Sequence, residues 1–386
     1  MVYLDNAATS FPKPEEVYVR MDTFMRKSCA NPGRSSHEMA RESADVVTKA
    51  RESIAKLFNV DNPLRIGFTL NATMALNIAI HGTLKKGDHV ITTAMDHNSV
   101  LRPLHELKKR GIIDYTVILP KNRFGEIDAS SFSKAVRTNT RMIVTTLSSN
   151  VTGIVLPYAE IGEIARKKGV LYLLDAAQGA GVLPIDVKGM NISMLAFPGH
   201  KGLMGPQGTG GLYVREDVTL NPIIQGGTGS RSIETMQPDF MPDMIESGTL
   251  NTPGIAGLCA GVDFIRKTGT DAICMKKKNL IERLYEGIAA NRRIRLYSTI
   301  EGYENSGIIA FLIEGMDSSE VSNILDSKYH IATRPGFHCA PLAHKAIGTY
   351  KTGLVRLSPG YFTTPDEIQY TVDSINELTT VPRGRF

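Results

Sequence analysis

Short β-rich runs alternate with amphipathic helical segments over residues 65–214, and this alternation limits the fold more than any other feature. Near-continuous apolar runs such as VLYLL (170–174) suit strands that are buried on both faces. The pattern predicts an α/β fold in which helices cover a mostly parallel, seven-stranded sheet. The seven runs are RIGFTL (65–70), HVITTA (89–94), YTVILP (115–120), RMIVTTL (141–147), VLYLLDA (170–176), SMLAF (193–197) and GGLYV (210–214).

The two ends of the chain differ from this central region. Residues 36–58 have apolar positions at helical spacing and predict a helix with Ser36 as its N-cap. Beyond about Ala256, a long helical stretch is followed by shorter strand-like pieces, which predicts a smaller α+β domain. We therefore expect a large domain of residues 16–255 and a small domain formed by residues 1–15 and 256–386.

Composition and charge exclude several classes of protein. The 386 residues are 42% hydrophobic and 22% charged, as in globular proteins, and the formal net charge is only +5. The one dense basic run, KKKN (276–279), predicts a solvated helix face, so we expect no nucleic-acid binding. No apolar window approaches the length of a bilayer span and the first residues lack a secretion signal. We therefore expect no membrane attachment and a cytoplasmic location.

The four cysteines include no C-x-x-C pair, so the sequence signals neither a zinc site nor a disulfide framework. A reducing compartment is expected. Cys339 differs from the others because it lies in RPGFHCAP (334–341), between a histidine and an alanine. Composition alone favours a small buried side chain there, and a reactive thiol held on a loop is the alternative.

Residues that follow two of the expected strands carry chemistry, because ligands in such sheets bind at the carboxyl ends of the strands. Asp175 closes VLYLLD, where a buried carboxylate needs a cationic partner such as a protonated ring nitrogen, although an N-cap or turn is the simpler interpretation. Gln178 offers an amide to a ring oxygen. Lys201 follows an apolar strand and suits a Schiff base once its surroundings lower its pKa.

Two further strand ends complete the pattern. Asn71, Ala72 and Thr73 lie between a strand and a helix, where N–H groups and a hydroxyl suit a phosphate, although Thr73 equally suits an N-cap. His97 leaves the end of another strand, where an imidazole can stack on an aromatic ring, although a lone histidine is more often structural. Together these residues indicate a ligand with an aldehyde, a ring nitrogen and a phosphate. Pyridoxal 5′-phosphate (PLP) has all three.

Motifs spread over nearly the whole chain carry a family resemblance. They are YLDNAATSFPKP, MDHNSVLRPL, SSNVTGIVLP, LLDAAQGAG, FPGHKGLMGPQGTGGLYV, ESGTLNTPGI, RPGFHCAP and VRLSPGYFTTPDEI. Through them the sequence resembles the class V aminotransferase family of fold type I PLP enzymes, and within it the cysteine desulfurase and selenocysteine lyase group. The resemblance implies the PLP-dependent transferase fold type I, with a large α/β domain and a smaller C-terminal α+β domain.

The resemblance also implies a role toward PLP for each matching residue. Lys201 binds the cofactor covalently, Asp175 pairs with the pyridine nitrogen, and Gln178 bonds the ring hydroxyl. His97 stacks on the ring and takes part in catalysis. The remaining cofactor contacts are expected from Thr73, Asn150, His200 and Thr249. In the family the last of these reaches across from the other subunit, so a homodimer is implied.

The implied enzyme is a PLP-dependent cysteine desulfurase that converts L-cysteine to L-alanine. Asn150 and Arg356 match positions that hold the amino-acid carboxylate, and Arg334 is expected to bind the substrate with them. Arg334 and His338 are also candidates to stabilise a Cys339 thiolate. Cys339, on a mobile and accessible loop, takes the sulfur as a persulfide and passes it to a sulfur-acceptor protein. The sequence leaves three alternatives for the pathway that receives the sulfur: iron–sulfur cluster assembly, tRNA thiolation and selenium supply.

Three positions depart from the family pattern. Pro198 and Ala72 replace residues whose hydroxyls contact the phosphate, and Phe337 replaces a histidine before the cysteine. The alternative functions are a selenocysteine lyase acting on L-selenocysteine, another class V aminotransferase or lyase, a cofactor-free Cys-His hydrolase, and a non-catalytic PLP-binding or sulfur-scaffold protein.

Overall fold

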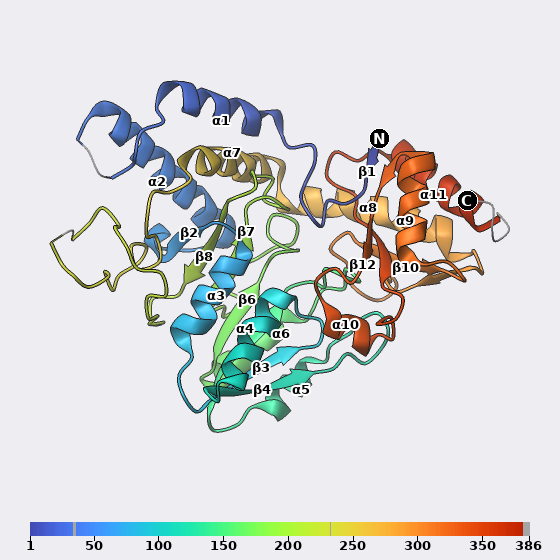
Figure 1. Ribbon diagram of the computed structural model, residues 1–386, viewed down its shortest axis with the longest axis horizontal. Helices are drawn as coiled ribbons and strands as arrows, with labels where there is room; N and C mark the ends of the chain where they lie inside the picture. The colour runs from blue at the N-terminus through green and yellow to red at the C-terminus, as the bar shows by residue number, and fades with distance from the viewer. Residues whose placement is uncertain (34–35, 232, 381–386) are drawn as a thin grey trace.

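The computed structural model describes residues 1–33, 36–231 and 233–380, and a seven-stranded sheet lies at its centre (Figure 1). The strand order is β2-β8-β7-β6-β5-β3-β4, and all neighbours are parallel except the pairs that β8 makes with β2 and β7. This sheet confirms the expected α/β class and all seven strand-forming runs. The strands are β2 (Ile66–Thr69), β3 (Asp88–Thr93), β4 (Ile113–Ile118), β5 (Thr140–Thr146), β6 (Leu171–Asp175), β7 (Met194–Pro198) and β8 (Gly210–Val214).

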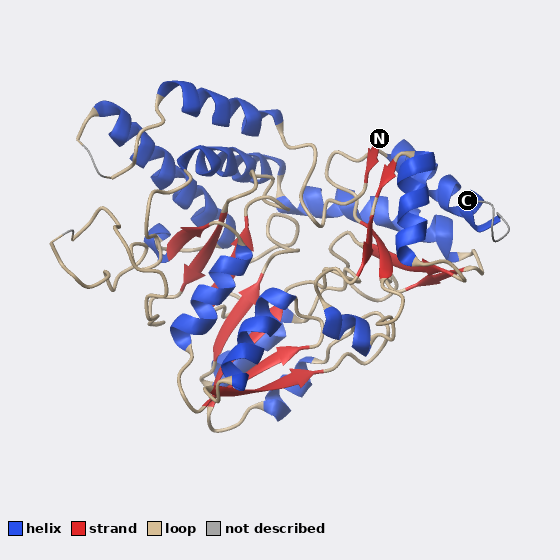
Figure 2. Ribbon diagram, viewed as in Figure 1, coloured by secondary structure: helices blue, strands red, loops and turns tan. Residues whose placement is uncertain are grey.

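Helices cover both faces of this sheet, because alternate strand residues point to opposite sides (Figure 2). Met142 and Val144 of β5 belong to the core beneath α3 and α4, whereas Ile143 belongs to the core shared with α2, α5, α6 and α7. All three side chains are fully buried. These helices, with the outer α1, are α1 (Glu15–Lys27), α2 (Glu38–Phe58), α3 (Ala72–Thr83), α4 (Asn98–Lys109), α5 (Ala129–Ala135), α6 (Tyr158–Lys168) and α7 (Thr252–Thr268).

A second, smaller assembly follows α7 and contains the four-stranded antiparallel sheet β12-β13-β10-β9. β1 (Val2–Tyr3) joins it by pairing in parallel with β11 (Ile331–Ala332), so the N-terminal segment lies beside the C-terminal part of the chain (Figure 1). Its other elements are α8 (Thr270–Ala289), β9 (Ile294–Leu296), β10 (Ile309–Ile313), α9 (Ser318–Tyr329), β12 (Arg334–Gly336), α10 (Pro341–Ala346), β13 (Leu354–Leu357) and α11 (Pro365–Thr380).

Helix α7 crosses the proposed domain boundary at residue 256. It packs against α1 and α2, and its Leu258 and Val262 are fully buried in the core of the large sheet. The division into residues 16–255 and residues 1–15 with 256–386 stays a prediction.

Two helix boundaries differ from the sequence expectations. α2 begins at Glu38, and its N-cap is His37, whose Nδ1 accepts a hydrogen bond from the Ala40 N–H at 3.3 Å, so the prediction of Ser36 as N-cap is wrong. The long helical stretch after Ala256 is two helices, α7 and α8, because the chain turns at Gly269 with a φ of 90°.

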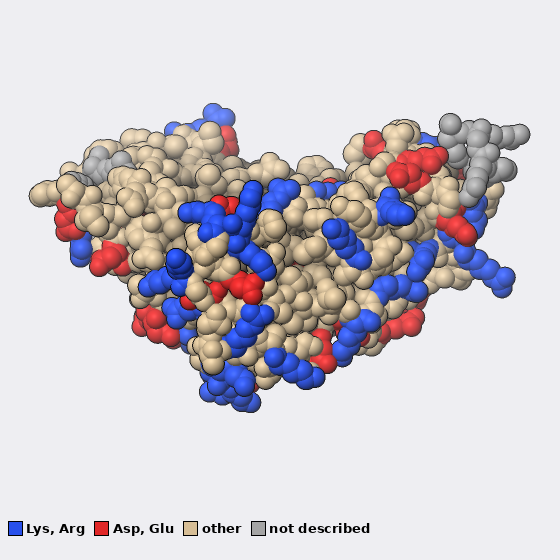
Figure 3. Space-filling view, turned by 60° about the horizontal axis from the view of Figure 1, so that its bottom comes forward, with Lys and Arg blue, Asp and Glu red and all other residues tan. Residues whose placement is uncertain are grey.

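The surface carries charges of both signs. Lys and Arg predominate among the charged side chains on the face shown in Figure 3, with Asp and Glu between them. Some of these charges are paired: exposed Asp114 contacts both Lys108 and Arg137, at 2.7 and 2.9 Å. In the described ranges, no helix has the length and apolar character needed to cross a membrane.

Candidate active site

A cavity lies where the strands of the large sheet end, as expected for a sheet of this kind. β5, β6 and β7 contribute their last residues to it, and the turns after β2 and β3 close its sides. Seven of the predicted site residues line this cavity: Thr73, His97, Asn150, Asp175, Gln178, His200 and Lys201.

Lys201 lies in the turn that follows β7. Gly199 makes this turn possible, because a Cβ there would lie 2.1 Å from the Oγ1 of Thr209. Burial, followed by the charge of Arg356, lowers the pKa of Lys201 to about 8. No hydrogen-bond acceptor contacts its amine within the described part of the chain. A substantial fraction of Lys201 therefore carries a free, nucleophilic amine near neutral pH.

Asp175 is the last residue of β6 and is 2% exposed. Its Oδ1 accepts a hydrogen bond from the Ala177 N–H at 2.9 Å, which is its one hydrogen bond among the described residues. Burial raises the pKa of this carboxyl, whereas the Ala177 N–H and Lys201 act in the opposite direction. The second oxygen is thus left for a cationic group inside the cavity.

His97 is held at the start of α4, where it is the N-cap. The preceding residue, Asp96, is fully buried and accepts hydrogen bonds from Thr92, Thr93 and Thr146, which fixes the turn after β3 to β5. Burial, and next the charge of Lys201, lower the pKa of His97 to about 4, so its imidazole is neutral at pH 7.

Ser99 is a site residue that the sequence reading missed. It lines the cavity, and its Oγ lies 2.7 Å from the Oγ1 of Thr73 and 2.9 Å from the Nδ1 of His97. Thr73 itself is not an N-cap, because Asn71 fills that position in α3 through a bond from the Met74 N–H. The available signal was a serine two residues after His97, at a helix start.

His200 offers an unpartnered polar atom to the cavity. Its Nδ1 is buried and has no hydrogen-bond partner in the described structure, and burial, then Lys201, lower the pKa of its imidazole to about 4. The N-terminal segment fixes this residue, since Ser10 N–H and the Thr9 hydroxyl donate to the His200 carbonyl at 3.0 and 3.1 Å. An imidazole N–H without an acceptor suits an anionic ligand.

Arg356 lies on β13 and is 0% exposed. Its Nη1 donates to the Asn150 carbonyl at 2.9 Å and its Nη2 to Asp5 at 2.8 Å, whereas its Nε has no partner in the described structure. Asp5, which the sequence reading also missed, compensates the buried guanidinium. One donor of Arg356, its Nε–H, is therefore without an acceptor and suits a second carboxylate.

Cys339 lies between β12 and α10 and is exposed. Two contacts hold its loop against the large sheet: the Asn98 N–H donates to the Cys339 carbonyl at 2.9 Å, and the Asn150 amide to the His338 carbonyl at 2.6 Å. The Nη2 of Arg334 lies 3.7 Å from its Sγ. The thiol is thus accessible, as expected, and its loop is anchored at two points; the mobility of the loop stays a prediction.

Comparison with known proteins assigns this arrangement to a family. The model for aminotransferase class-V matches residues 2–371. The chain belongs to the class V aminotransferase family. This confirms the resemblance, and members of the family use PLP as their cofactor.

Several similar proteins are named as cysteine desulfurases. A protein of Methanothermobacter thermautotrophicus called probable cysteine desulfurase is 35% identical, and the match covers 98% of this chain and 94% of that protein. Cysteine desulfurase IscS of Glaesserella parasuis is 30% identical over 98% of this chain and 93% of its own. An apo structure of cysteine desulfurase from Thermococcus onnurineus superposes with a TM-score of 0.91 at 30% identity, covering 98% of this chain and 94% of that chain.

His338 does not act on the thiol in the way that the sequence suggested. Its side chain is buried, its Nε2 lies 3.0 Å from the Arg334 carbonyl, and burial lowers its pKa well below the ordinary value. A neutral imidazole that faces the loop interior supplies no charge to a thiolate. Of the two candidates, only Arg334 is placed to do so.

Phe337, where the family's desulfurases have a histidine, packs on the outside of α10. Its ring lies edge-on to His344, with centroids 5.3 Å apart, and 5.7 Å from the ring of Tyr350. Phe337 is 45% exposed. It therefore joins a surface aromatic cluster.

Thr249 is exposed in the segment between β8 and α7 and does not line the cavity of its own subunit. Its Oγ1 lies 3.5 Å from the side-chain amide of Asn31. The expectation that it completes the site of a second subunit stays a prediction.

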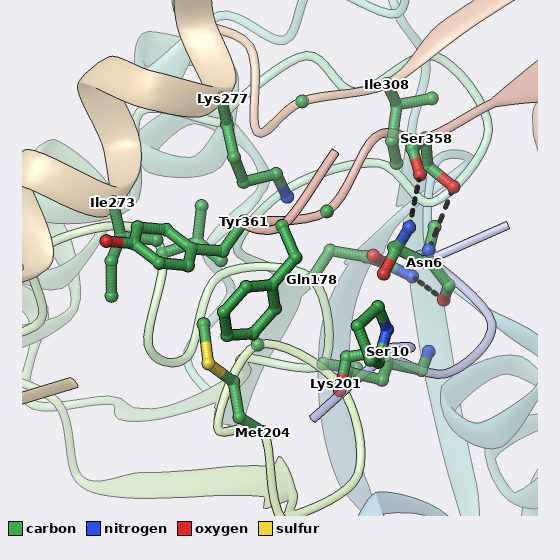
Figure 4. Close-up of a pocket in the computed structure, with 18 residues that line it drawn as sticks. Asn6, Ser10, Gln178, Lys201, Met204, Ile273, Lys277, Ile308, Ser358 and Tyr361 are labelled. Carbon is green, nitrogen blue, oxygen red and sulfur yellow. Dashed lines mark hydrogen bonds between the residues drawn. The ribbon is translucent and has the colours of Figure 1, made fainter. Parts of the chain in front are cut away.

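A second cavity adjoins the first and shares Ala177, Gln178 and Lys201 with it (Figure 4). Lys277 points into this cavity from α8, so the prediction that the whole KKKN run lies on a solvated face is wrong for its second residue. Burial lowers the pKa of Lys277 to about 8. The lysine stem lies close to Gly307, where a Cβ would come within 2.4 Å of the Lys277 Cε.

Proposed function

We propose that the protein is a PLP-dependent cysteine desulfurase that converts L-cysteine to L-alanine and keeps the sulfur on Cys339 as a persulfide. One observation carries this proposal beyond family membership. The carbonyl of the exposed Cys339 accepts a hydrogen bond from the N–H of Asn98. Asn98 follows His97, and His97 lines the cavity that contains Lys201. A transferable thiol is thereby anchored next to the cavity.

The residues of the cavity fit PLP. Lys201 would bind it covalently, the open oxygen of Asp175 suits its ring nitrogen, and Gln178 and His97 suit the ring. The phosphate would be held by Thr73, by the unpartnered Nδ1 of His200 and, in a homodimer, by Thr249 of the second subunit. Bound PLP supplies an electron sink that stabilises negative charge at the Cα of an amino acid.

The chain's own groups account for the remaining chemistry. The Nζ of Lys201, with a pKa of about 8, is the base for the Cα proton of the substrate. Arg356 presents its open Nε, and Asn150 helps to orient the substrate carboxylate. Arg334 stabilises the Cys339 thiolate, which forms an S–S bond to the substrate sulfur as the substrate C–S bond breaks. The electron pair of the broken C–S bond stays with the carbon fragment, which takes up protons at Cβ and Cα and leaves as L-alanine. The outer sulfur of the persulfide then passes to a thiol of an acceptor protein.

We further propose a cytoplasmic location. All four cysteines are free in the described structure, which suits a reducing compartment in which a persulfide passes between thiols. Iron–sulfur cluster assembly is one candidate for the pathway that the sulfur-acceptor protein serves.

The test is to incubate the purified protein with L-cysteine and a reductant and to quantify alanine and sulfide. We expect the two products in equal amounts. Cys339→Ala is expected to keep the PLP absorbance and to lose sulfide release from L-cysteine by at least about 100-fold. Bound PLP with neither product, or full activity in Cys339→Ala, would overturn the proposal.

L-Selenocysteine provides the discriminating substrate for the alternative function. Selenium leaves more readily than sulfur, so a selenocysteine lyase would turn over L-selenocysteine in Cys339→Ala at the wild-type rate and would leave L-cysteine almost unused in both proteins. A desulfurase requires Cys339 for L-cysteine, and this pair of measurements separates the two.

A further inference from the structure

The family pattern places hydroxyl-bearing residues at positions 72 and 198, but this chain has Ala72 and Pro198 there, so this end of the cavity lacks two hydroxyls. It contains another hydroxyl, that of Ser99, which the pattern does not predict. Ser99 is 8% exposed and lines the cavity with Ala72, Thr73 and Pro198. Its Oγ lies 2.7 Å from the Oγ1 of Thr73, although the two residues follow different strands. The sheet thus brings two hydroxyls together at the start of two helices.

The backbone of Ser99 determines the tautomer of His97. A backbone N–H can only donate, and that of Ser99 lies 3.1 Å from the His97 Nδ1. The Nδ1 of His97 is therefore an acceptor, and the single ring proton is on Nε2, because a pKa of about 4 keeps the imidazole neutral. The Ser99 hydroxyl also lies 2.9 Å from the His97 Nδ1, but the N–H bond alone is sufficient to fix the tautomer.

The Ser99 hydroxyl has two acceptors within reach, the His97 Nδ1 at 2.9 Å and the Thr73 Oγ1 at 2.7 Å. An anion in the cavity favours the second arrangement, because the Thr73 hydroxyl can donate to the anion only when its own oxygen accepts from Ser99. Hydrogen bonds arranged in such a chain strengthen one another, and a bond to a charged acceptor gains most.

We propose that Ser99 is a positioning residue of the cofactor phosphate site, whose hydroxyl turns the Thr73 hydroxyl toward the phosphate while its backbone N–H orients His97. This inference rests on the proposed function, since the anion is the phosphate of PLP. It explains how a site with alanine at residue 72 and proline at residue 198 keeps a directed hydroxyl donor.

The test is a titration of the full-length protein, freed of PLP by dialysis, with PLP and with pyridoxal, which has no phosphate. Ser99→Ala removes the hydroxyl and keeps the N–H bond to His97. We expect its dissociation constant for PLP, read from the absorbance of the bound cofactor, to rise about tenfold, and its constant for pyridoxal to stay within twofold of wild type. Ser99→Thr is expected to restore PLP binding.

The chain offers a matched control in Ser319→Ala. Ser319 is also the second residue of its helix, and its N–H donates to the N-cap Asp317 at 2.8 Å, but it is exposed and far from the cavity in the fold. We expect this variant to bind PLP as wild type does. Wild-type PLP affinity in Ser99→Ala, or an equal loss for PLP and pyridoxal, overturns the role of Ser99. Failure of the wild-type protein to bind PLP overturns the proposed function instead.

Discussion

The pKa values of Lys201 and Lys277 are lowered alike, although the two lysines have very different surroundings. Burial lowers the pKa of each to about 8, and both point into the cavity shown in Figure 4. Around Lys201 lie Asp175 and His97 at the strand ends and Arg356 on β13; the charge of Arg356 lowers the pKa of Lys201, and that of Asp175 raises it. Around Lys277 only the Cys274 thiol contributes among the described groups.

The difference shows that a lowered pKa alone does not define an active site. Lys277 is half-buried because helix geometry turns one lysine of a basic run inward, and apart from Lys201 the residues that line its cavity are uncharged. Lys201 is surrounded by groups that we propose bind the ring and phosphate of PLP and the carboxylate of the substrate. Four substitutions, two of them with a control variant, test this difference between the surroundings of Lys201 and Lys277.

The largest effect is expected for Lys201→Ala. Without its amine, the site loses both covalent attachment of PLP and the base for the Cα proton, so alanine formation should fall by at least about 1,000-fold. Borohydride reduction of the wild-type protein followed by peptide mapping should place the cofactor on Lys201. The matched variant Lys277→Ala should keep more than half of the activity. Cofactor found on Lys277 would break the comparison.

Asp175→Asn removes the carboxylate that distinguishes the surroundings of Lys201. An amide keeps the shape and the bond from the Ala177 N–H, but it does not keep a ring nitrogen protonated. We expect kcat for alanine formation to fall on the order of 100-fold, with PLP still bound and its absorbance maximum shifted. Unchanged kcat would show that Asp175 has only a structural role.

Arg334→Gln tests the charge next to the thiol. The Arg334 guanidinium is 3.7 Å from the Cys339 Sγ, so its loss should destabilise the thiolate. Sulfide release from L-cysteine at pH 7 should be reduced about tenfold. The same variant should bind PLP normally. Unchanged sulfide release would assign the activation of Cys339 to another group.

Lys277→Met should have the smallest effect on activity and a measurable effect on stability. The folded-state pKa of about 8 lies below the ordinary value of ~10.4, so the unfolded chain binds more protons between these values. The contribution of Lys277 to the free energy of unfolding of the wild-type protein therefore increases as the pH rises from 8 to 10. Below pH 8, Lys277 is charged in the folded state, and the full cost of burying that charge lowers the stability. The free energy of unfolding of the variant should lack this increase, and at pH 7 it should be about 1 kcal/mol higher than that of the wild type.

Urea unfolding of wild type and Lys277→Met at pH 7, 8.5 and 10 measures this contribution. Lys201 has a shift of the same sign, but it is present in both proteins and cancels in their difference. Lys276→Met, at an exposed position of the same helix, is the control and should leave the pH dependence unchanged. A parallel pH dependence for wild type and Lys277→Met would contradict a buried, charged Lys277.

Sequence patterns predicted the centre of the site because parallel strands end at one edge of a sheet. Asp175, Lys201, His97 and Thr73 each follow a β-rich run directly, so their proximity required only the sheet itself. The class V motifs added Arg356 and Cys339, which no local pattern connects to that edge.

The residues that the sequence did not reveal depend on contacts between distant segments. Asp5 reaches Arg356 only because the N-terminal strand β1 pairs with β11, and Ser99 reaches Thr73 only because β2 and β3 place two helix starts together. Lys277 differs from Lys276 and Lys278 by a rotation about the axis of α8, and a run of like residues does not indicate which one faces inward.

The pairing of β1 with β11 also sets an order of events during synthesis. Residues that follow β1 fix His200 and Arg356, but the strand that receives β1 lies at the far side of the central sheet in the sequence. Long-range pairing of this kind forms late, after the central sheet has emerged. The cofactor pocket is therefore complete only once β1 has paired with β11, and loading with PLP is expected to follow that pairing.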